Sequence, residues 1–462
     1  MDKIIAIFCF FTAISVIFLA FPEGNIAVLV TAVLSVIVII LIRQNSDESK
    51  FLIRIFLVGL LARIIFGIFI HVFDLRGFFG GDALTYDFSG QRLVDIWFNG
   101  APVDEFFSQR AISTGTPGWG LNYLVGFLYT ITGQNILAAQ FMCATIGAAT
   151  APMVYVCAHK IFHNNRVGKI AAVMVALFPA FIIWSGQLLK DGLIIFLLVL
   201  AMTMVLQLQE RLNYFAVIFL LFSLFGILSL RFYIFYMVAI SVAGSFIIGQ
   251  AGSVKSIVRG FILLIVMGLV LMYLGVLRTA TDNFDKWGSL ESVQRSRSDL
   301  ARSADSGFGG DADVSTTEGA IAAIPLGFTY LMLAPFPWQL GSLRQSITIP
   351  EMIVWWCSIP LMIMGLGYTI KNRLRNAIAI LIFTLMLTIS YSIFQGNVGT
   401  AYRQRTQIQV FLFIFIAVGW TLRKEKKENE KAVNAAKREQ VDRSLRQKRI
   451  NDSENRGQDL EK

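Results

Sequence analysis

The sequence predicts an all-α polytopic membrane protein with about twelve transmembrane helices and further helices beside the outer membrane face. The first observation is composition: 56% of the 462 residues are hydrophobic and 15% are charged, against about 25% charged in soluble domains. The second is that apolar stretches of about 18 residues, long enough to cross a bilayer, recur along the chain. The third is a mean hydropathy of +0.65. Together these exclude soluble enzymes, secreted scaffolds and nucleic-acid-binding proteins.

Each predicted span is a long apolar segment with few charges. The first, from Ile4 to Phe21, is longer than the core of a signal peptide, and no small-residue cleavage pattern precedes Pro22, so we expect it to be retained. The predicted spans are residues 4–21, 25–42, 52–72, 134–158, 168–188, 191–208, 213–230, 232–249, 259–277, 351–370, 375–394 and 406–422.

The net charge of +10 predicts the orientation of these spans. Basic residues collect in the connections 43–54, 159–169, 255–259 and 371–375 and in the tail from Arg423. Because cytoplasmic loops are rich in Lys and Arg, all five segments are expected in the cytoplasm, together with both termini. The predicted location is the cytoplasmic (inner) membrane of a bacterium.

Two further apolar stretches do not fit this alternation. Trp119–Ile131 is short, and Ala320–Trp338 is interrupted by three prolines. We expect both to be re-entrant or interfacial helices on the outer side, covered by the rest of the protein.

The predicted organisation has five parts. They are an N-terminal transmembrane hairpin (1–50), a transmembrane core (51–277) with a large outer loop (73–133), a second large outer loop (278–350), C-terminal transmembrane helices (351–422) and a charged cytoplasmic tail (423–462). The tail is expected to be a solvated helix or a disordered end.

The first outer loop contains the first candidate catalytic acid. Gly80 and Gly81 precede Asp82 and allow the backbone to turn tightly. Asp82 is either the N-cap of a following helix, or a general base or divalent-metal ligand at the membrane surface. Tyr86, one helical turn later, is a candidate substrate-binding residue, whereas Asp87 faces elsewhere and is expected to be structural.

A second acid lies between the fifth and sixth predicted spans, in the sequence Lys190-Asp191-Gly192. The turn is so short that these residues must lie at the membrane face. Lys190 and Asp191 either neutralise each other, or Asp191 is a second carboxylate over the same cavity as Asp82 while Lys190 binds a phosphate.

Polar residues also end two other pairs of spans on the outer side. They are Arg231, Tyr233, Asn397, Arg403 and Arg405, and their basic members depart from the usual charge bias. Because arginine binds phosphate oxygens bidentately, these residues are candidates for holding a lipid-linked phosphate. The alternative is ion pairing with lipid headgroups or with acids of the outer loops.

The order of these motifs resembles a known family. A span is followed by an outer Gly80-Gly81-Asp82-Ala-x-x-Tyr86 loop, by Thr116-Pro117-Gly118-Trp119 at the start of an outer helix, and by Asp191 about 110 residues after Asp82. This arrangement resembles the GT-C superfamily of polyprenyl-phosphate-dependent glycosyltransferases, in particular the branch of protein O-mannosyltransferases and lipid A aminoarabinose transferases. The resemblance covers residues 52–235, with weaker support from 397–405.

The resemblance implies roles for several of these residues. Asp82 matches the first-loop acid that activates the acceptor, and Asp191 matches a second outer acid. Arg403 and Arg405 are placed, by location alone, to hold the donor phosphate. Many relatives have Asp-Glu where this chain has Asp82-Ala83; a divalent metal at Asp82 and Asp191 is therefore left open, and no cofactor is assigned.

The predicted function is transfer of a sugar from a polyprenyl-phosphate-linked donor to a glycan, lipid or protein acceptor at the outer membrane face. One alternative is an O-antigen or exopolysaccharide repeat-unit polymerase or ligase, and another is a transporter or flippase of lipid-linked sugars. Transporters place polar groups near the midplane, whereas here they concentrate at outer span ends. Arg63, near the middle of the third span, is the exception: it either pairs inside the bundle or indicates that the limits of that span are shifted.

Overall fold

The computed structural model describes residues 2–79, 81–103, 118–248, 254–302 and 306–460. Over these residues the secondary structure is helical, apart from one isolated β-bridge between Gly307 and Asn397. The helices are α1 (Asp2–Leu19), α2 (Glu23–Asn45), α3 (Ser49–Val72), α4 (Arg76–Phe79), α5 (Asp82–Phe98), α7 (Trp119–Thr132), α8 (Ile136–Phe162), α9 (Asn165–Leu177), α10 (Pro179–Ser185), α11 (Lys190–Glu210), α12 (Tyr214–Leu230), α13 (Phe232–Ile248), α14 (Val254–Tyr273), α15 (Val276–Trp287), α16 (Leu290–Arg302), α17 (Thr317–Leu333), α18 (Leu343–Asn372), α19 (Leu374–Phe394) and α20 (Val398–Leu460).

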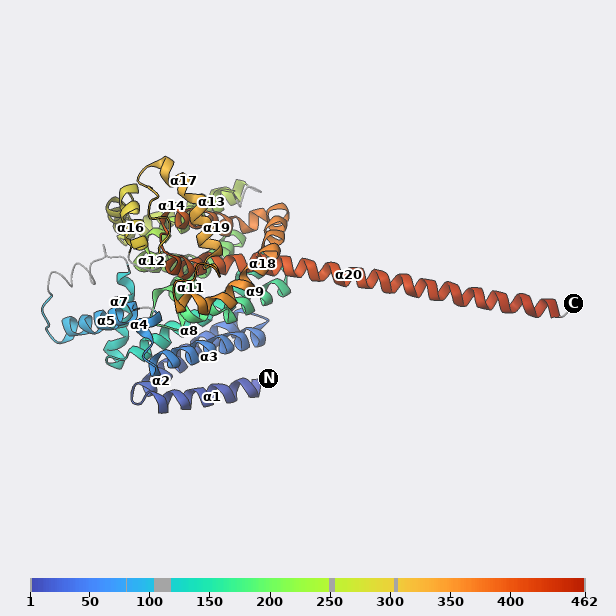
Figure 1. The fold of residues 1–462 in the computed structure, drawn as a ribbon, viewed down its shortest axis with the longest axis horizontal. Helices are drawn as coiled ribbons and strands as arrows, with labels where there is room; N and C mark the ends of the chain where they lie inside the picture. Colours follow the sequence, from blue (N-terminus) through green and yellow to red (C-terminus); the bar gives the residue numbers. More distant parts are fainter. Residues whose placement is uncertain (1, 80, 104–117, 249–253, 303–305, 461–462) are drawn as a thin grey trace.

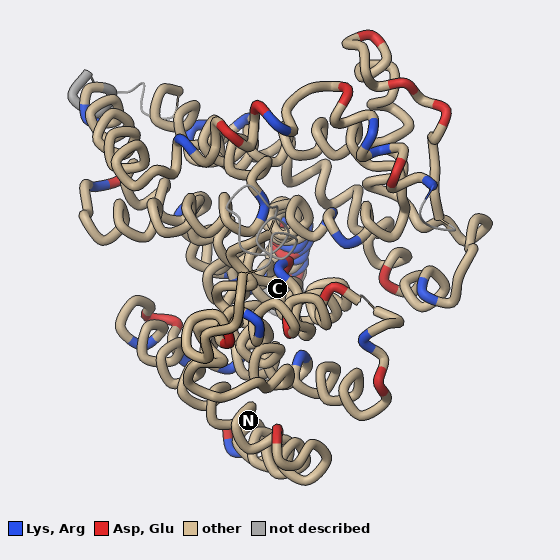
Figure 2. The backbone as a smooth tube through the Cα atoms, turned by 90° about the vertical axis from the view of Figure 1, so that its left-hand side faces the viewer, with Lys and Arg blue, Asp and Glu red and all other residues tan. Residues whose placement is uncertain are grey.

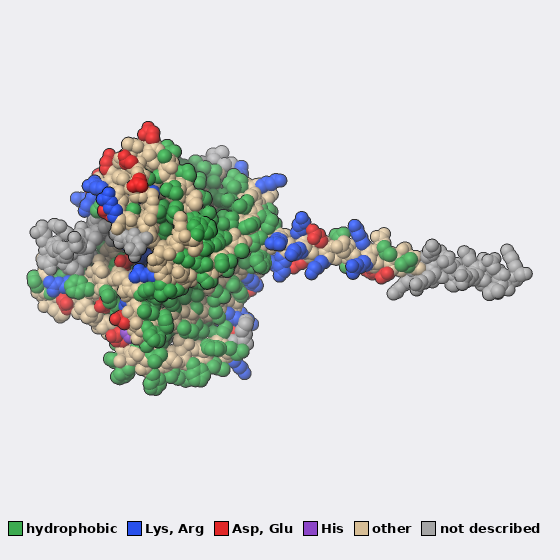
Figure 3. Space-filling view, in the orientation of Figure 1, with side chains coloured by type: hydrophobic (Ala, Val, Ile, Leu, Met, Phe, Trp, Pro, Cys, Tyr) green, Lys and Arg blue, Asp and Glu red, His purple; other side chains and the backbone are tan. Residues whose placement is uncertain are grey.

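The long helices form a bundle with an apolar outer surface. Large hydrophobic side chains such as Phe8, Phe18 and Phe215 are exposed, and Figure 3 shows such side chains covering the body, while charged side chains gather at its left end and along the helix that leaves at the right. A soluble protein does not expose so much apolar surface. The fold is therefore that of a membrane-spanning protein.

The predicted spans coincide with helices, but not all of them pass a test of length and composition. Within the described residues, 8 helices are long and apolar enough to cross a membrane, or up to 10 if each of two bent pairs is one span. The bent pairs are α9 with α10 and α14 with α15, and α12, α13 and α17 are shorter apolar helices. The two stretches expected to be re-entrant form α7 and α17.

The predicted span 168–188 is broken, and the break explains the buried arginine. The chain bends by 55° between α9 and α10, where Pro179 lacks the N–H of a continuous helix. Arg63 donates to the freed carbonyl groups of Val175 and Ala176 at 3.4 and 3.0 Å, and to the Ser185 hydroxyl at 2.7 Å. Arg63 thus pairs inside the bundle, as expected, although its partners are carbonyl and hydroxyl groups.

The last helix is the centre of the bundle. Figure 2 looks along α20, and the other helices surround it; it packs against α9, α11, α17 and α18. Small residues bring α18 and α20 close together, since a Cβ at Gly365 would lie 1.9 Å from the Phe415 carbonyl oxygen and one at Gly419 would lie 2.0 Å from that of Leu361. This close backbone contact with α18 sets the position of α20 along its own axis.

The two ends of the bundle carry different segments of the chain. The N-terminus lies at the end where α20 leaves the body, and α4, α5 and α16 lie at the opposite end (Figure 1). Beyond the body α20 continues as one helix to Leu460, so the charged tail is helical. Helices from both large loops, α4 and α5 from the first and α16 from the second, therefore share one end of the bundle, where the candidate site lies.

Candidate active site

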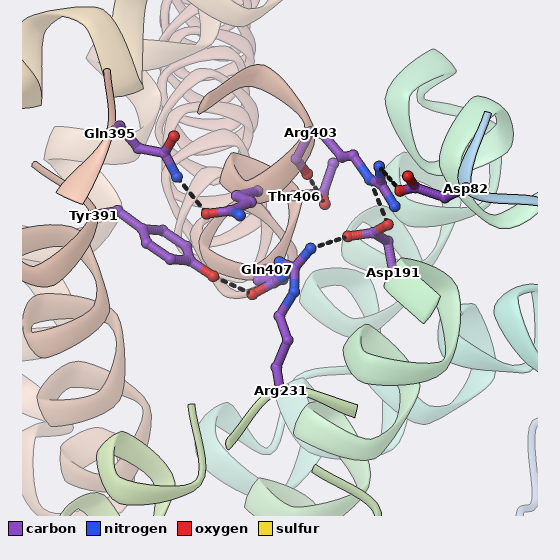
Figure 4. A network of polar contacts seen from close by, with 9 residues as sticks. Asp82, Asp191, Arg231, Tyr391, Gln395, Arg403, Thr406 and Gln407 are labelled. Carbon is purple, nitrogen blue, oxygen red and sulfur yellow. Dashed lines mark hydrogen bonds and ion pairs between the residues drawn. The ribbon is translucent and has the colours of Figure 1, made fainter. Parts of the chain in front are cut away.

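Four chain segments that are far apart in sequence meet at the loop-bearing end of the bundle. Asp82 is in the first turn of α5, Lys190 and Asp191 begin α11, Arg231 follows the last residue of α12, and Arg403 is in the second turn of α20. Figure 4 shows the side chains of Asp82, Asp191, Arg231 and Arg403 pointing toward one another from these segments. The structure thus brings both predicted catalytic acids together with three of the predicted basic residues.

Ion pairs connect these side chains into one network. Arg403 donates from Nε to Asp191 Oδ2 at 2.6 Å and from Nη1 to Asp82 Oδ2 at 2.9 Å. Arg231 donates from Nη2 to Asp191 Oδ1 at 3.1 Å (Figure 4). Arg403 therefore bridges the two acids, and each oxygen of Asp191 accepts from a different arginine.

The inner and outer parts of this network differ in exposure. The side chain of Asp191 is 0% exposed, those of Arg231 and Arg403 are 7% and 15% exposed, and that of Asp82 is 54% exposed. Breaking a buried pair leaves an unpaired charge out of water, whereas an exposed pair contributes little to stability. The N-terminus of α11 also stabilises the Asp191 carboxylate through the helix dipole. Asp191 thus anchors the arginines, and Asp82 is the accessible acid.

Lys190 and Tyr86 line a common position beside Gly118. A Cβ at Gly118 would lie 2.8 Å from Lys190 Nζ and 3.6 Å from the Tyr86 hydroxyl oxygen, and Gly118 has φ +92°. Burial raises the pKa of the Tyr86 phenol, so it stays protonated and can donate a hydrogen bond. Among the described residues no acid pairs with Lys190. The interpretation that Lys190 and Asp191 neutralise each other is wrong, because arginines occupy both oxygens of Asp191.

A buried polar layer lies beneath the ion pairs and was missed in the sequence. The Tyr391 hydroxyl donates to Gln407 Oε1 at 2.7 Å, and Gln395 donates to Gln404 (Figure 4). The run Tyr-Arg-Gln-Arg-Thr-Gln over 402–407 within an apolar helix is the signal that could have found it, since polar groups are costly in a membrane interior. Trp184 was also missed; its ring centroid lies 5.4 Å from Arg403 Cζ.

Arg405 does not belong to the site. Its guanidinium is fully buried, and Nη1 donates to the carbonyl oxygens of Leu331, Met332 and Ala334 at 3.4, 3.2 and 2.9 Å. These carbonyl groups end α17, where the helix lacks internal partners for them. Arg405 therefore caps α17, and the structure does not bring it together with the predicted site residues around Asp191.

Asn397, a predicted substrate-binding residue, makes structural hydrogen bonds at the start of α20. Its Oδ1 accepts from the backbone N–H groups of Gly399 and Thr400 at 2.8 and 3.3 Å and from the Ser306 hydroxyl at 3.1 Å. Its Nδ2 donates to the Leu300 carbonyl oxygen at 3.3 Å. Asn397 thus caps the start of α20 and attaches the second large loop to it.

Two other residues support the site from its edges. The ring of Tyr233 packs against those of Tyr391 and Phe394, with centroids 6.2 and 6.1 Å apart, so Tyr233 borders the buried polar layer. Asp87 accepts from the Tyr129 hydroxyl at 2.5 Å and from Gln134 at 3.0 Å. Asp87 therefore joins α5 to α7 and its loop, and the expectation that it is structural is confirmed.

Asp82 does not cap its helix. Gly81 occupies the N-cap position of α5, and no side chain caps that end. The Asp82 carboxylate instead reaches Arg403 on α20. The interpretation of Asp82 as a helix cap is therefore wrong, and its carboxylate is left for other chemistry.

The charges of the site do not suit a divalent cation. The described residues contain no group of three His, Cys, Asp or Glu side chains placed to hold a metal. Lys190, Arg231 and Arg403 carry three positive charges against two negative charges on Asp82 and Asp191, a net +1 that repels cations. The same excess attracts anions, and the arginine fork binds phosphate oxygens bidentately.

Comparison with known families and curated proteins finds no relative of this chain. No model of a protein family matches the chain. No curated protein matches it in sequence. The function is therefore inferred from the arrangement of charge, burial and exposure around Arg403.

Proposed function

We propose that this chain is a membrane glycosyltransferase of GT-C type. It transfers a sugar from a polyprenyl-phosphate-linked donor to a glycan, lipid or protein acceptor at the outer face of a bacterial cytoplasmic membrane. The observation that carries the proposal is the half-exposed carboxylate of Asp82, paired with a buried, net positive group at one end of an apolar bundle.

The charge of the site suits the phosphate of such a donor. A lipid-phosphate-sugar is a phosphodiester with one negative charge, which balances the net +1 of Lys190, Arg231, Arg403, Asp82 and Asp191. Arginine forks and a lysine ammonium group bind the phosphate oxygens. The same cations stabilise the phosphate as it gains charge in the transition state, where such preorganised groups have their largest effect.

The exposure of Asp82 suits a general base. In the proposed reaction the hydroxyl of the acceptor gives its proton to Asp82 while its oxygen bonds to the anomeric carbon of the sugar. The bond from that carbon to the phosphate oxygen breaks, and the phosphate keeps the electron pair. A carboxylate 54% exposed is accessible to an acceptor from the aqueous side, and the Tyr86 phenol beside it supplies a hydrogen-bond donor.

The surroundings of the site suit a lipid chain. Trp119, next to Gly118, contacts Phe225 of α12 with ring centroids 6.0 Å apart, and Phe225 is exposed on the apolar surface. The phosphate-binding group is thus continuous with the surface that faces lipid. In the proposed topology α12, α13 and both bent helix pairs cross the membrane, giving twelve spans with cytoplasmic termini, and α7 and α17 are re-entrant on the outer side.

A repeat-unit polymerase or ligase is the second candidate, and the two buried arginines Arg231 and Arg403 favour it. The net charge counts against it, because these enzymes use donors with a diphosphate, and its second negative charge would exceed the net +1 of the site. A transporter is less well supported, because the charged cluster lies at helix ends rather than at the midplane.

The test is sugar transfer by the full-length chain in membranes, with labelled polyprenyl-phosphate sugars as donors and outer-membrane or cell-wall glycans as acceptors. Asp82→Asn is expected to lower transfer by roughly 10²- to 10⁴-fold. Asp95→Asn is the matched control, because Asp95 is on the same helix and, within the described part of the chain, its side chain accepts from its helix neighbours Gln91 and Asn99. Full transfer by the Asp82→Asn protein would rule out the proposed mechanism, and activity with diphosphate donors alone would favour a polymerase.

A further inference from the structure

The guanidinium of Arg403 has three nitrogen atoms in three different situations. Its Nε donates to the fully buried Asp191, and its Nη1 donates to the half-exposed Asp82. Its Nη2 is buried and has no hydrogen-bond partner among the described residues. A buried donor without an acceptor is costly, so this atom points to a ligand that accepts from it.

The two ion pairs of Arg403 are unequal in strength. The pair with Asp191 is buried, and breaking it would leave Asp191 and Arg403 charged in an apolar interior. The pair with Asp82 is open to water and therefore easily exchanged. The ring of Trp184 lies against the guanidinium and holds its plane in place. The Nε atom of Arg403 is thus held by Asp191, whereas the partner of its Nη1 atom can be exchanged.

Phosphate binds to arginine through two neighbouring N–H groups at once. In Arg403 the free end of the fork is made by Nη1 and Nη2, because Nε is held by Asp191. Nη2 is without an acceptor among the described residues, whereas Nη1 already donates one of its N–H groups to Asp82. A phosphate that accepts from both Nη1 and Nη2 therefore approaches a nitrogen that Asp82 already holds, and it competes with that carboxylate for Nη1.

We propose that the donor phosphate displaces Asp82 from Arg403 and thereby releases the carboxylate that accepts the proton of the acceptor. This step rests on the proposed function and makes donor binding a condition for activating the acceptor. No covalent bond changes in the exchange: one hydrogen bond from Nη1 moves from the carboxylate oxygen to a phosphate oxygen. In the donor-free protein the base stays paired.

The start of α5 leaves Asp82 room to turn away from Arg403. A Cβ built on the preceding Gly81 meets no heavy atom of the described residues within 4 Å, and the first turn of α5 carries no side-chain cap. Because the Asp82 side chain is 54% exposed, its carboxylate can turn from Arg403 toward the aqueous side, where the acceptor approaches. The phosphate that replaces it stays within reach of Lys190, which has no acid partner among the described residues.

The test measures binding instead of transfer. The probe is farnesyl monophosphate, titrated into the full-length chain in detergent and followed by calorimetry, with inorganic phosphate as a second probe for the headgroup alone. Asp82→Asn removes the competitor and is expected to bind farnesyl monophosphate roughly two- to fivefold more tightly than the unmodified chain. Asp95→Asn is the control and is expected to leave the affinity unchanged.

A double-mutant cycle separates exchange at the fork from general charge repulsion. Arg403→Lys keeps the charge but has no fork, so adding Asp82→Asn to it is expected to give no further tightening. Unchanged or weaker binding by the Asp82→Asn single variant overturns the exchange, and so does equal tightening when Asp82→Asn is added to the Arg403→Lys variant. Loss of transfer with unchanged binding would overturn the exchange alone, whereas full transfer by Asp82→Asn would overturn the proposed function.

Discussion

Arg403 and Asp191 are 212 residues apart in the sequence, yet Arg403 Nε lies 2.6 Å from Asp191 Oδ2 at the loop-bearing end of the bundle. The contact joins the second turn of α20 to the first turn of α11. Because Asp191 also holds Arg231, one carboxylate sets the positions of two arginines. The network is therefore both a structural connection and the frame of the candidate site.

The first prediction concerns this carboxylate. Asp191→Asn leaves the geometry but removes the charge that balances Arg231 and Arg403, and breaking a buried pair in this way costs about 3–5 kcal/mol. We expect a lower melting temperature of the detergent-solubilised chain together with weaker binding of farnesyl monophosphate. Asp82→Asn is the comparison, and it is expected to change the melting temperature little because its pair is exposed. Equal destabilisation by the two variants would contradict the assignment of Asp191 as the anchor.

The second prediction concerns Gly118, and Gly133 is its control. Gly118 and Gly133 both have positive φ, +92° and +71°. A Cβ at Gly118 would lie 2.8 Å from Lys190 Nζ, whereas one at Gly133 meets no atom of the described residues within 4 Å. Substitution by Ala is expected to destabilise the chain by about 1–2 kcal/mol at either position, because L-residues are strained there. Only Gly118→Ala is expected to weaken phosphate binding, since it also displaces Lys190. The measurements are thermal unfolding and calorimetric titration; equal affinities in the two variants would remove Lys190 from the site.

Most of the helix positions could be predicted, because apolar length is a local property of the sequence. The clustering of Asp82, Asp191 and Arg231 followed from topology, since all three lie at span ends on one side. The contacts of Arg405 could not be predicted because the predicted spans end at 394 and resume at 406, which leaves Arg405 in the turn between them, whereas α20 begins at Val398. In a helix, side chains two positions apart point about 200° apart, so Arg403 and Arg405 face opposite directions. The packing partners of both arginines come from distant segments that local patterns do not specify.

The buried Arg63 gives a third prediction, for stability alone. Arg63→Met removes the donor that satisfies the carbonyl groups of Val175 and Ala176 at the break before Pro179. Leaving buried acceptors without partners costs about 1–3 kcal/mol each, so the melting temperature is expected to fall. Phosphate affinity of the folded fraction is expected to stay the same. A change in affinity without a change in melting temperature would instead place Arg63 on a substrate path, as in a transporter.

The last prediction compares the two arginines of α20, which differ in role although they are two positions apart. Arg405 Nη1 donates to three carbonyl groups at the end of α17. Arg405→Lys is therefore expected to lower the melting temperature, because some of these buried carbonyl groups lose their donor. The affinity for farnesyl monophosphate is expected to change by less than about twofold, because the lost hydrogen bonds are structural. Arg403→Lys keeps the charge beside Asp191 but loses the fork, so it is expected to weaken binding by roughly tenfold, the loss of one charge-assisted hydrogen bond. The pair is measured by thermal unfolding and by titration of the same preparations. If Arg405→Lys weakens binding as much as Arg403→Lys, the phosphate site extends to the α17 end, and the division of the two side chains into a capping and a binding arginine is wrong.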